Sequence, residues 1–411
     1  MDVLIIGAGI GGLTLGLMLH EAGIPCRIYE AAPEIKPLGV GINLLPHAMK
    51  ELSALGLEET LAAAGVATAE AVFFNRFGQL IYQEPLGRAG GYDWPQISIH
   101  RGDLQAALVA AFIARAGADR LMLGWQCTKV ADGDGAAVAH FRHIATQKAL
   151  PPQRGAAIIA CDGIHSTVRK QLYPDEGEPI YSGVNMWRGV TRWTPILSGA
   201  AMIRAGWFTH AKIVIYPIRH KVDADGRQLV NWVVEIATPK YERWNWSRTA
   251  KLEDFLAPMA DWHFDWLDVP EFLRRSETVL EYPMVDKDPL PRWSFGRITL
   301  LGDAAHPMYP RGSNGAGQAI LDARALADCL AAGDDPIAAL SAYDERRREA
   351  TANVVRTNRT TPPDAILGEV YRRSGDKPFQ SIDDIIGRAE LVAITDAYKR
   401  VAGYEKDKLR R

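Results

Sequence analysis

Three glycines near the amino terminus, Gly7, Gly9 and Gly12, have the spacing of a dinucleotide-binding turn. The first glycine permits a tight turn, the second lets the backbone approach a pyrophosphate, and the third lets a helix pack on the preceding strand. Unpaired N–H groups and the dipole at the start of that helix favour the negative charge of a phosphate. Glu30, 18 positions after Gly12, is placed to bond a ribose hydroxyl. These residues predict a bound dinucleotide.

The segments around these glycines occur in the order that such a site needs. Residues 2–6 are an apolar run of strand length, residues 13–21 fit a helix, and residues 25–29 fit a second strand that ends at Glu30. An isolated glycine triplet would indicate an ordinary turn. The strand, turn, helix and second strand in register favour the dinucleotide interpretation.

Two later motifs place a carboxylate at the end of an apolar strand. Residues 156–160 lead to Asp162 within DGIHSTVR, and residues 297–301 lead to Asp303 within GDAAHP. In an open α/β sheet, ligands lie outside the carboxyl ends of the strands. We therefore expect both motifs to meet the dinucleotide site. A helix opening at residues 314–317 follows the second motif.

The middle of the chain predicts a second sheet. Strand patterns at residues 184–190, 213–218 and 229–236 are separated by turn-rich segments. The last pattern alternates, with apolar residues on one face and Asn231 and Glu235 on the other. One apolar and one polar face are typical of a sheet that covers something.

Composition and charge limit the kind of protein this is. A chain of 411 residues is too long for one typical core, and its formal net charge of −2 does not favour nucleic acid or a membrane surface as a partner. The four cysteines have no CxxC pair and no metal spacing, which argues against disulfides and a metal site and favours the cytoplasm. The apolar start carries Asp2 and several glycines and lacks a basic segment, unlike a signal peptide.

The motifs GAGIGG, DGIHSTVR and GDAAHP, in this order and spacing, resemble the single-component FAD-dependent aromatic hydroxylases, the class A flavoprotein monooxygenases with the para-hydroxybenzoate hydroxylase fold. The resemblance covers roughly residues 1–359. Segments 37–43, 98–105, 186–190 and 282–286 look like those of hydroxylases of phenazine pigment pathways. One departure is Arg311, a cation at a position where we expect methionine in that group.

The resemblance implies an α/β fold, with a Rossmann-like FAD-binding domain interleaved with a smaller mixed β-sheet domain for the substrate, and with C-terminal helices. The expected segments are 1–70, 101–175 and 286–360 for the discontinuous FAD-binding domain, 71–100 and 176–285 for the substrate domain, and 361–411 for a helical tail.

The implied activity is hydroxylation of an aromatic or heteroaromatic small molecule with O₂, through a flavin C4a-hydroperoxide. FAD is the expected cofactor, and NADH or NADPH is expected as a transient co-substrate, since no second glycine fingerprint for a bound nicotinamide follows. The alternatives are a flavin monooxygenase acting on a non-aromatic or antibiotic-like substrate, and a flavin-binding protein without turnover. A homodimer is left open.

The resemblance also assigns residues to the cofactor. Glu30 would hold the adenosine ribose, Arg101 the pyrophosphate or ribitol, backbone near Cys127 the adenine, and Asp303 the ribitol hydroxyls. The start of the helix at Gly315 would face the N1/C2=O edge of the flavin. The full set of candidates is Gly7, Gly9, Ile10, Gly11, Gly12, Glu30, Val40, Gly41, Arg101, Cys127, Asp162, Asp303, Pro310, Gly312, Gly315 and Ala316.

The substrate pocket is expected between the second sheet and the loop at residues 307–314. Tyr309 is the preferred wall, because it directly follows the flavin-edge motif, and Arg311 is a candidate partner for a substrate carboxylate. No catalytic acid or base is identified, and His306 fits a structural role better than one as a base. The candidate walls are Trp187, Arg188, Tyr216, Trp232, Met284, Pro307, Tyr309 and Arg311.

Overall fold

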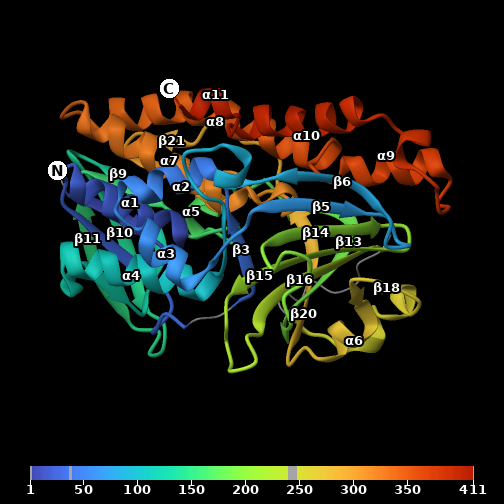
Figure 1. The fold of residues 1–411 in the computed structure, drawn as a ribbon. Coiled ribbons are helices and arrows are strands. Elements are labelled where there is room, and N and C mark those ends of the chain that lie inside the picture. The colour runs from blue at the N-terminus through green and yellow to red at the C-terminus, as the bar shows by residue number, and fades with distance from the viewer. Residues whose placement is uncertain (1, 37–38, 239–247, 411) are drawn as a thin grey trace.

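A mainly parallel six-stranded sheet carries the glycine-rich turn (Figure 1). The structure is a computed structural model that describes residues 2–36, 39–238 and 248–410; Pro37 and Leu38, which begin one of the motif segments, lie outside this range. Neighbouring strands pair in parallel except β21 with β22. The strand order is β21 (Ser294–Phe295), β22 (Ile298–Leu300), β12 (Ala157–Ala160), β1 (Val3–Ile6), β2 (Cys26–Glu30) and β8 (Leu121–Leu123).

Helices cover this sheet because the residues that face it are apolar. Every residue of β1 is buried, and α1 (Ile10–Glu21), which begins directly after the turn, packs against α4 (Arg101–Ala116) and α7 (Gly315–Ala331). Helix α4 begins at Arg101, because the ring nitrogen Nδ1 of His100 accepts from the N–H of Gly102 and caps the helix. Shorter helices are α2 (Pro46–Ala54), α3 (Glu58–Ala64) and α5 (Thr167–Leu172).

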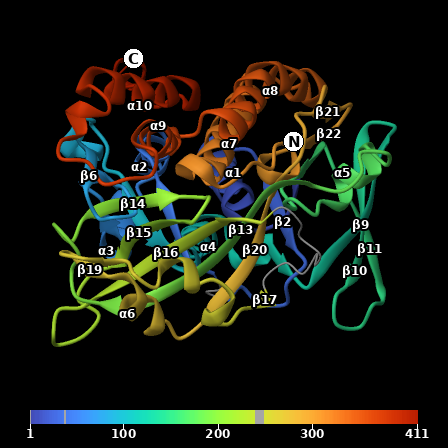
Figure 2. The same cartoon turned by 90° about the vertical axis from the view of Figure 1, so that its right-hand side faces the viewer.

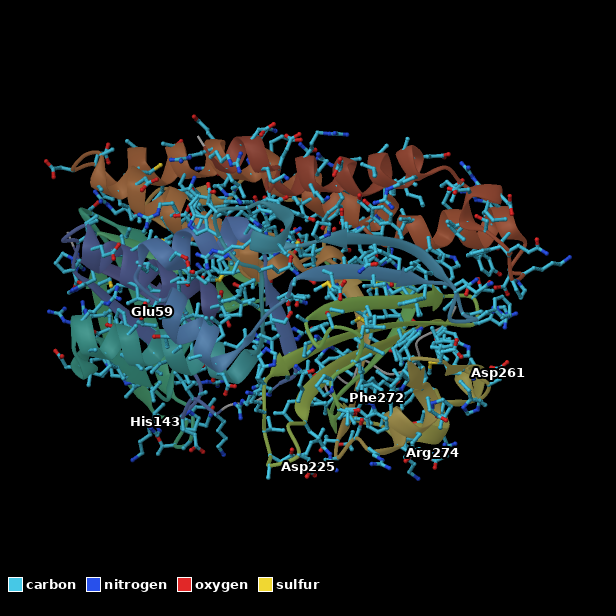
Figure 3. The ribbon with its side chains drawn as sticks, viewed as in Figure 1. Glu59, His143, Asp225, Asp261, Phe272 and Arg274 are labelled. Atoms are coloured by element: carbon cyan, nitrogen blue, oxygen red, sulfur yellow. The ribbon has the colours of Figure 1, made fainter. Side chains whose placement is uncertain are left out.

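The second sheet has eight strands and is mostly antiparallel. The expected strands of the middle region lie inside β13, β15 and β16, whereas β14 and β20 were not expected. Below the sheet, α6 (Val269–Arg274) buries Phe272 against one face (Figure 3). The order is β17 (Arg248–Thr249), β20 (Val279–Asp286), β13 (Ile180–Trp193), β16 (Gln228–Ala237), β15 (Ala211–Arg219), β14 (Ala201–Trp207), β5 (Glu70–Phe74) and β6 (Leu80–Pro85).

Three small sheets complete the described part of the chain, and one of them is a two-stranded pair, β18 (His263–Phe264) with β19 (Leu267–Asp268). The three strands between residues 125 and 155 form an antiparallel sheet at the edge of the molecule (Figure 2), which the sequence did not predict. The other small sheet joins the loop before α2 to the strand before α4. The strands are β9 (Trp125–Gly133), β10 (Ala136–His143) and β11 (Ala149–Gly155), then β3 (Gly41–Leu44), β7 (Ile97–His100) and β4 (Val66–Ala67).

The carboxy-terminal helices lie across one side of the whole molecule (Figure 1). The long helix α8 (Pro336–Thr360) packs on α7, and α9 (Ala365–Ser374) and α10 (Arg388–Ala402) pack on β5 and β6. Within α8, Arg347 is mostly buried, and its Nε donates to Asp322 over 2.7 Å. The chain ends with α11 (Lys406–Leu409). None of the described helices combines the length and the apolar character needed to cross a membrane.

Candidate active site

A cavity of about 380 Å³ lies between the glycine-rich turn, the start of α7 and one face of the eight-stranded sheet. Its volume is within the usual range for small-molecule sites. Ten of the predicted cofactor residues line it. These are Gly9, Ile10, Gly11, Val40, Gly41, Arg101, Asp303, Pro310, Gly315 and Ala316.

The three glycines of the turn have different surroundings. Gly7 has a φ of +105° and donates its N–H to the carbonyl of Tyr29, and a Cβ on Gly12 would lie 2.1 Å from the Gly7 carbonyl oxygen. A Cβ on Gly9 would meet no protein atom within 4 Å, because this residue faces the cavity. Gly7 and Gly12 therefore fix the turn, while Gly9 leaves room for a ligand at the start of α1.

The carboxylate of Glu30 accepts two hydrogen bonds at the glycine-rich turn. One carboxylate oxygen accepts from the N–H of Ala8 and the other from the N–H of Ala32, both over 2.8 Å. Ala8 precedes Gly9, which lines the cavity together with Asp303. Glu30 itself is not among the lining residues, and its contact with Ala8 places it beside the turn that lines the cavity together with Asp303.

The amino terminus of α7 opens on the same cavity. Asn314, Gly315 and Ala316 line it, and the first N–H groups of an α-helix have no partner within the helix. This end is suited to a ligand edge that carries negative charge. Asn314 is fixed from behind, because its side chain donates to the hydroxyl of Tyr398 over 3.1 Å.

The loop before β3 is held against the second sheet at Gly41. Its N–H donates to Oδ1 of Asn231 over 2.7 Å, and its carbonyl accepts from Arg188 over 3.2 Å. A Cβ on Gly41 would lie 2.7 Å from Asn231, from Ile218 and from Tyr216. Only glycine fits this contact without displacing its neighbours, and the contact brings Val40 and Gly41 to the cavity.

One face of the eight-stranded sheet forms the wall opposite the turn. It includes two of the predicted substrate residues, Arg188 and Tyr216, and also Glu235, which the sequence analysis placed on the polar face without giving it a role. The wall residues are Met186, Arg188, Val214, Tyr216, Val233, Glu235 and Tyr282. The signal that could have identified Glu235 is the alternation of residues 229–236.

Trp187 and Trp232, both expected as pocket walls, lie on the opposite face of the sheet. Trp187 stacks on Phe255 at 5.4 Å, and Trp232 donates its Nε1–H to Ser276 over 2.8 Å. Side chains alternate between the two faces of a strand, so the position next to each tryptophan faces the cavity instead. The prediction that Trp187 and Trp232 are walls of the substrate pocket is therefore wrong.

The loop expected to form the far wall contributes different residues than predicted. Met308 and Pro310 line the cavity, whereas Tyr309 and Met284 pack in a small buried cluster. Burial raises the pKa of Tyr309 to about 12. Arg311 lies over the rings of Phe208, at 4.8 Å, and Tyr309, at 5.6 Å, and Pro307 is not among the lining residues.

Three further predicted cofactor residues lie outside the lining. Asp162 accepts from the N–H groups of Thr167 and Val168 at the start of α5, and burial raises its pKa. Cys127 is buried in β9, and burial raises the pKa of its thiol to about 12. Gly312 lines a second cavity.

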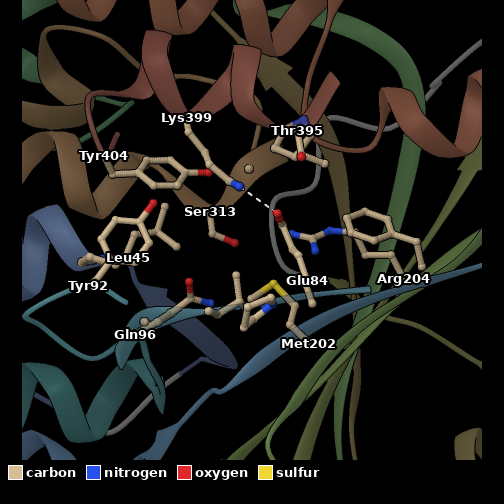
Figure 4. A pocket seen from close by; sticks show the side chains of 18 residues that line it. Leu45, Glu84, Tyr92, Gln96, Met202, Arg204, Ser313, Thr395, Lys399 and Tyr404 are labelled. Atoms are coloured by element: carbon tan, nitrogen blue, oxygen red, sulfur yellow. Dashed lines mark hydrogen bonds and ion pairs between the residues drawn. The ribbon is translucent and has the colours of Figure 1, made fainter. Parts of the chain in front are cut away.

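The second cavity, of about 50 Å³, lies beneath the carboxy-terminal helices (Figure 4). Lys399 and Glu84 form an ion pair of 2.7 Å across it, and Arg204 and Gln96 also contribute to its walls. Ser313 lines both cavities. The two spaces are therefore neighbours separated by the loop that carries Ser313.

His306, in the GDAAHP motif, is buried away from the cavity. Its Nε2 lies 2.5 Å from Asp322, whose other oxygen accepts from Arg347. His306 and Arg347 beside it hold the pKa of Asp322 below its usual value despite burial. This arrangement matches the structural role expected for His306.

One cavity is surrounded by a glycine-rich turn on a mainly parallel sheet, by two helix amino termini and by the face of a second sheet. This arrangement is that of a protein that encloses a dinucleotide beside a small-molecule pocket. The chain belongs to the FAD binding domain family, which it matches over residues 1–358.

The relatives are aromatic hydroxylases. The chain is 41% identical over 404 residues to the phenazine 1,6-dicarboxylic acid hydroxylase PhzS of Lysobacter antibioticus, with 97% of each covered. It is 30% identical over 367 residues to the 6-hydroxynicotinate 3-monooxygenase of Bordetella bronchiseptica, with 87% of this chain and 90% of that protein covered. These matches confirm the class predicted from the three motifs.

Solved structures share the fold. The crystal structure of HpxO from Klebsiella pneumoniae, complexed with FAD and uric acid, matches with a TM-score of 0.77 at 22% identity, and 97% of this chain and 96% of that chain are covered. The expected α/β fold is confirmed.

Proposed function

We propose that this protein is an FAD-dependent monooxygenase that uses NADH or NADPH and O₂ to hydroxylate an aromatic or heteroaromatic small molecule. The observation that carries the proposal is the single cavity that joins the dinucleotide turn, through Gly9 and Asp303, to the sheet wall at Arg188 and Tyr216. A bound flavin and a planar substrate would both have their walls there.

The residues of the cavity fit FAD. Gly9 leaves open space at the amino terminus of α1, where a pyrophosphate would lie, and Arg101 is a cation at the same opening. Asp303 offers a carboxylate to ribitol hydroxyls, and Gly41 is locked where a side chain would collide. When bound, FAD supplies the activation of O₂ after reduction by the nicotinamide.

The protein groups would then do three things. The free N–H groups at Gly315 and Ala316 would stabilise negative charge at the flavin edge. The apolar wall residues Val214 and Val233 would hold the aromatic ring and exclude water. Arg188 would orient an anionic substituent, since Arg311 lies outside the cavity lining.

The substrate we favour is a planar nitrogen heteroaromatic acid. The relative from Lysobacter antibioticus is named for phenazine 1,6-dicarboxylic acid. The four motif segments also look like those of 5-methylphenazine-1-carboxylate 1-monooxygenase. The cavity combines apolar walls with one cation on the sheet face, Arg188, which suits an aromatic carboxylate.

The test is a screen of NADH and NADPH consumption over phenazines, hydroxybenzoates and aminobenzoates, with product masses measured. The purified protein should be yellow from FAD, and an aromatic product should gain one oxygen atom. A colourless protein that cannot be reconstituted would refute the cofactor. An oxygen inserted only into aliphatic substrates would favour the non-aromatic alternative, and FAD binding without stimulated nicotinamide oxidation would favour a flavin-binding protein.

We also propose that the protein works in the cytoplasm and forms a homodimer. All four cysteines are free, as a reducing compartment favours. Light scattering of the purified holoenzyme tests the dimer, and a mass of 45.2 kDa, that of one chain, would refute it.

A further inference from the structure

We propose that Glu235 selects the substrate, which is a heteroaromatic monocarboxylate whose carboxylate lies on Arg188. Glu235 accepts a hydrogen bond from an O–H or N–H group of this substrate, and it excludes ligands with a second carboxylate. The inference rests on the proposed function, because it concerns the substrate of the same cavity.

The register of the sheet places the two charges on one face. Glu235 on β16 is opposite Met186 on β13, and Arg188 on β13 is opposite Val233. Arg188 and Glu235 are therefore diagonal neighbours, with side chains that start about 7 Å apart. Both line the cavity. A ring lying on this wall meets a cation at one end and a carboxylate at the other.

The apolar surface between them suits an aromatic ring. Val233 lies between the two charges along the wall and is opposite Val214 on β15. Arg188 donates to the Gly41 carbonyl, so it marks the end of the wall nearest the dinucleotide side. Glu235 therefore marks the deeper end, beside Met186.

Glu235 is part of a buried set of charged side chains. Its Oε2 lies 2.8 Å from Nζ of Lys212, which has no exposed surface and also pairs with Asp364. Asp364 in turn pairs with Arg204 over 2.9 Å. Two cations thus share two carboxylates, and Glu235 is the member of this set that lines the cavity.

The Glu235 carboxylate determines what this end of the wall accepts. A carboxylate has acceptor oxygens and no donor, so Glu235 satisfies a ligand hydroxyl or ring N–H. A second ligand carboxylate would face the Glu235 carboxylate, and like charges in a desolvated site repel strongly. The wall therefore favours a substrate with one acid group and one donor.

The experiment uses the FAD holoenzyme without nicotinamide and follows the flavin absorbance during ligand titration. The ligands are phenazine-1-carboxylate, 6-hydroxyphenazine-1-carboxylate and phenazine-1,6-dicarboxylate. We expect the dicarboxylate to bind at least tenfold more weakly than the hydroxy acid. In Glu235→Gln the dicarboxylate should gain at least tenfold in affinity, while phenazine-1-carboxylate changes less than threefold.

Two control variants distinguish a direct contact between Glu235 and the ligand from a general effect of removing a negative charge. Glu281→Gln removes an acid on β20 that accepts from Asn185 and is absent from the cavity lining, and it should leave all three affinities unchanged. Asp364→Asn removes the other acid of the buried set, and an equal change of preference in that variant would overturn the contact. If Glu235→Gln does not fold, the double variant with Lys212→Met removes the pair together and must show the same change.

The outcomes distinguish the two proposals. A wild-type holoenzyme whose nicotinamide oxidation is stimulated by none of the phenazines, hydroxybenzoates and aminobenzoates refutes the proposed function, and this inference with it. A wild type that turns over other aromatic compounds but responds to none of these three ligands refutes this inference alone. A wild type that turns over heteroaromatic acids but binds the dicarboxylate as well as the hydroxy acid refutes the role of Glu235 alone.

Discussion

Replacing Gly9 by alanine tests whether a pyrophosphate approaches the turn. Gly9 is the N-cap of α1, with φ −73° and ψ −178°, an extended conformation that alanine adopts, and its Cβ would meet no protein atom within 4 Å. Alanine reduces the freedom of the unfolded chain, which stabilises the folded protein by about 0.4–1 kcal/mol. Alanine is also a poorer N-cap than glycine, which offsets this gain. The unfolding free energy of the apoprotein should therefore change by less than about 1 kcal/mol. FAD affinity should fall at least tenfold, or about 1.4 kcal/mol.

The chain offers a matched control for this change. Gly387 is the N-cap of α10, with φ −72° and ψ 148°, and its Cβ is equally unobstructed, but it is absent from the cavity lining. Thermal unfolding of the apoproteins and titration with FAD, followed by quenching of flavin fluorescence, should show similar stability for both variants and weak FAD binding only for Gly9→Ala. Wild-type FAD affinity in Gly9→Ala would refute the placement of the pyrophosphate at this turn.

Three other substitutions test the remaining contacts. Glu30→Ala leaves the N–H groups of Ala8 and Ala32 without their acceptor, so FAD retention should weaken by about 1.5–3 kcal/mol; unchanged retention on gel filtration would show that the carboxylate is dispensable. Gly41→Ala forces a Cβ to within 2.7 Å of three side chains, so the melting temperature should fall with a cost of about 1–3 kcal/mol, and a wild-type melting curve would contradict the packing. Arg311→Met should leave the preference between carboxylated and neutral aromatic ligands unchanged in flavin titrations, because the guanidinium lies over the rings of Phe208 and Tyr309, outside the cavity lining. An altered preference would place Arg311 at the ligand.

The glycine-rich turn and Asp303, which line the cavity, could be located in the sequence because local spacing fixes them. The turn between β1 and α1 needs glycines at set intervals, and Asp303 follows directly from where β22 ends, whereas Asp162 after β12 accepts from the start of α5 outside the lining. Backbone geometry dictates both patterns, so residue spacing alone reveals them. The start of α7 could be predicted for the same reason.

The face of the second sheet that meets the cavity could not be chosen in this way. Trp187 and Trp232 are large and aromatic, which suggested a pocket for a ring, but the aromatic face of the sheet is covered by the segment that includes Phe255 and α6. The face with Arg188 and Glu235 covers the cavity. Alternation reveals that two faces exist, and only the tertiary contacts of each face determine which one meets the ligand.

The buried charges behind Glu235 also depend on residues far apart in the chain. Lys212 lies in the second sheet and Asp364 directly precedes α9, so no local pattern connects them. The same carboxy-terminal segment supports the other wall: the hydroxyl of Tyr398 donates to Asn358 over 2.7 Å and accepts from Asn314.

These contacts of Tyr398 make the carboxy-terminal tail part of the support for the site, although the tail lies beyond the family match, which ends at residue 358. A Cβ on Gly312 would lie 2.1 Å from the Tyr398 hydroxyl, so the loop before α7 is packed directly against α10. The helix end that faces the cavity therefore depends on residues after 361 for its position. The match to the relative from Lysobacter antibioticus covers 97% of this chain, so it extends past residue 358 into this tail.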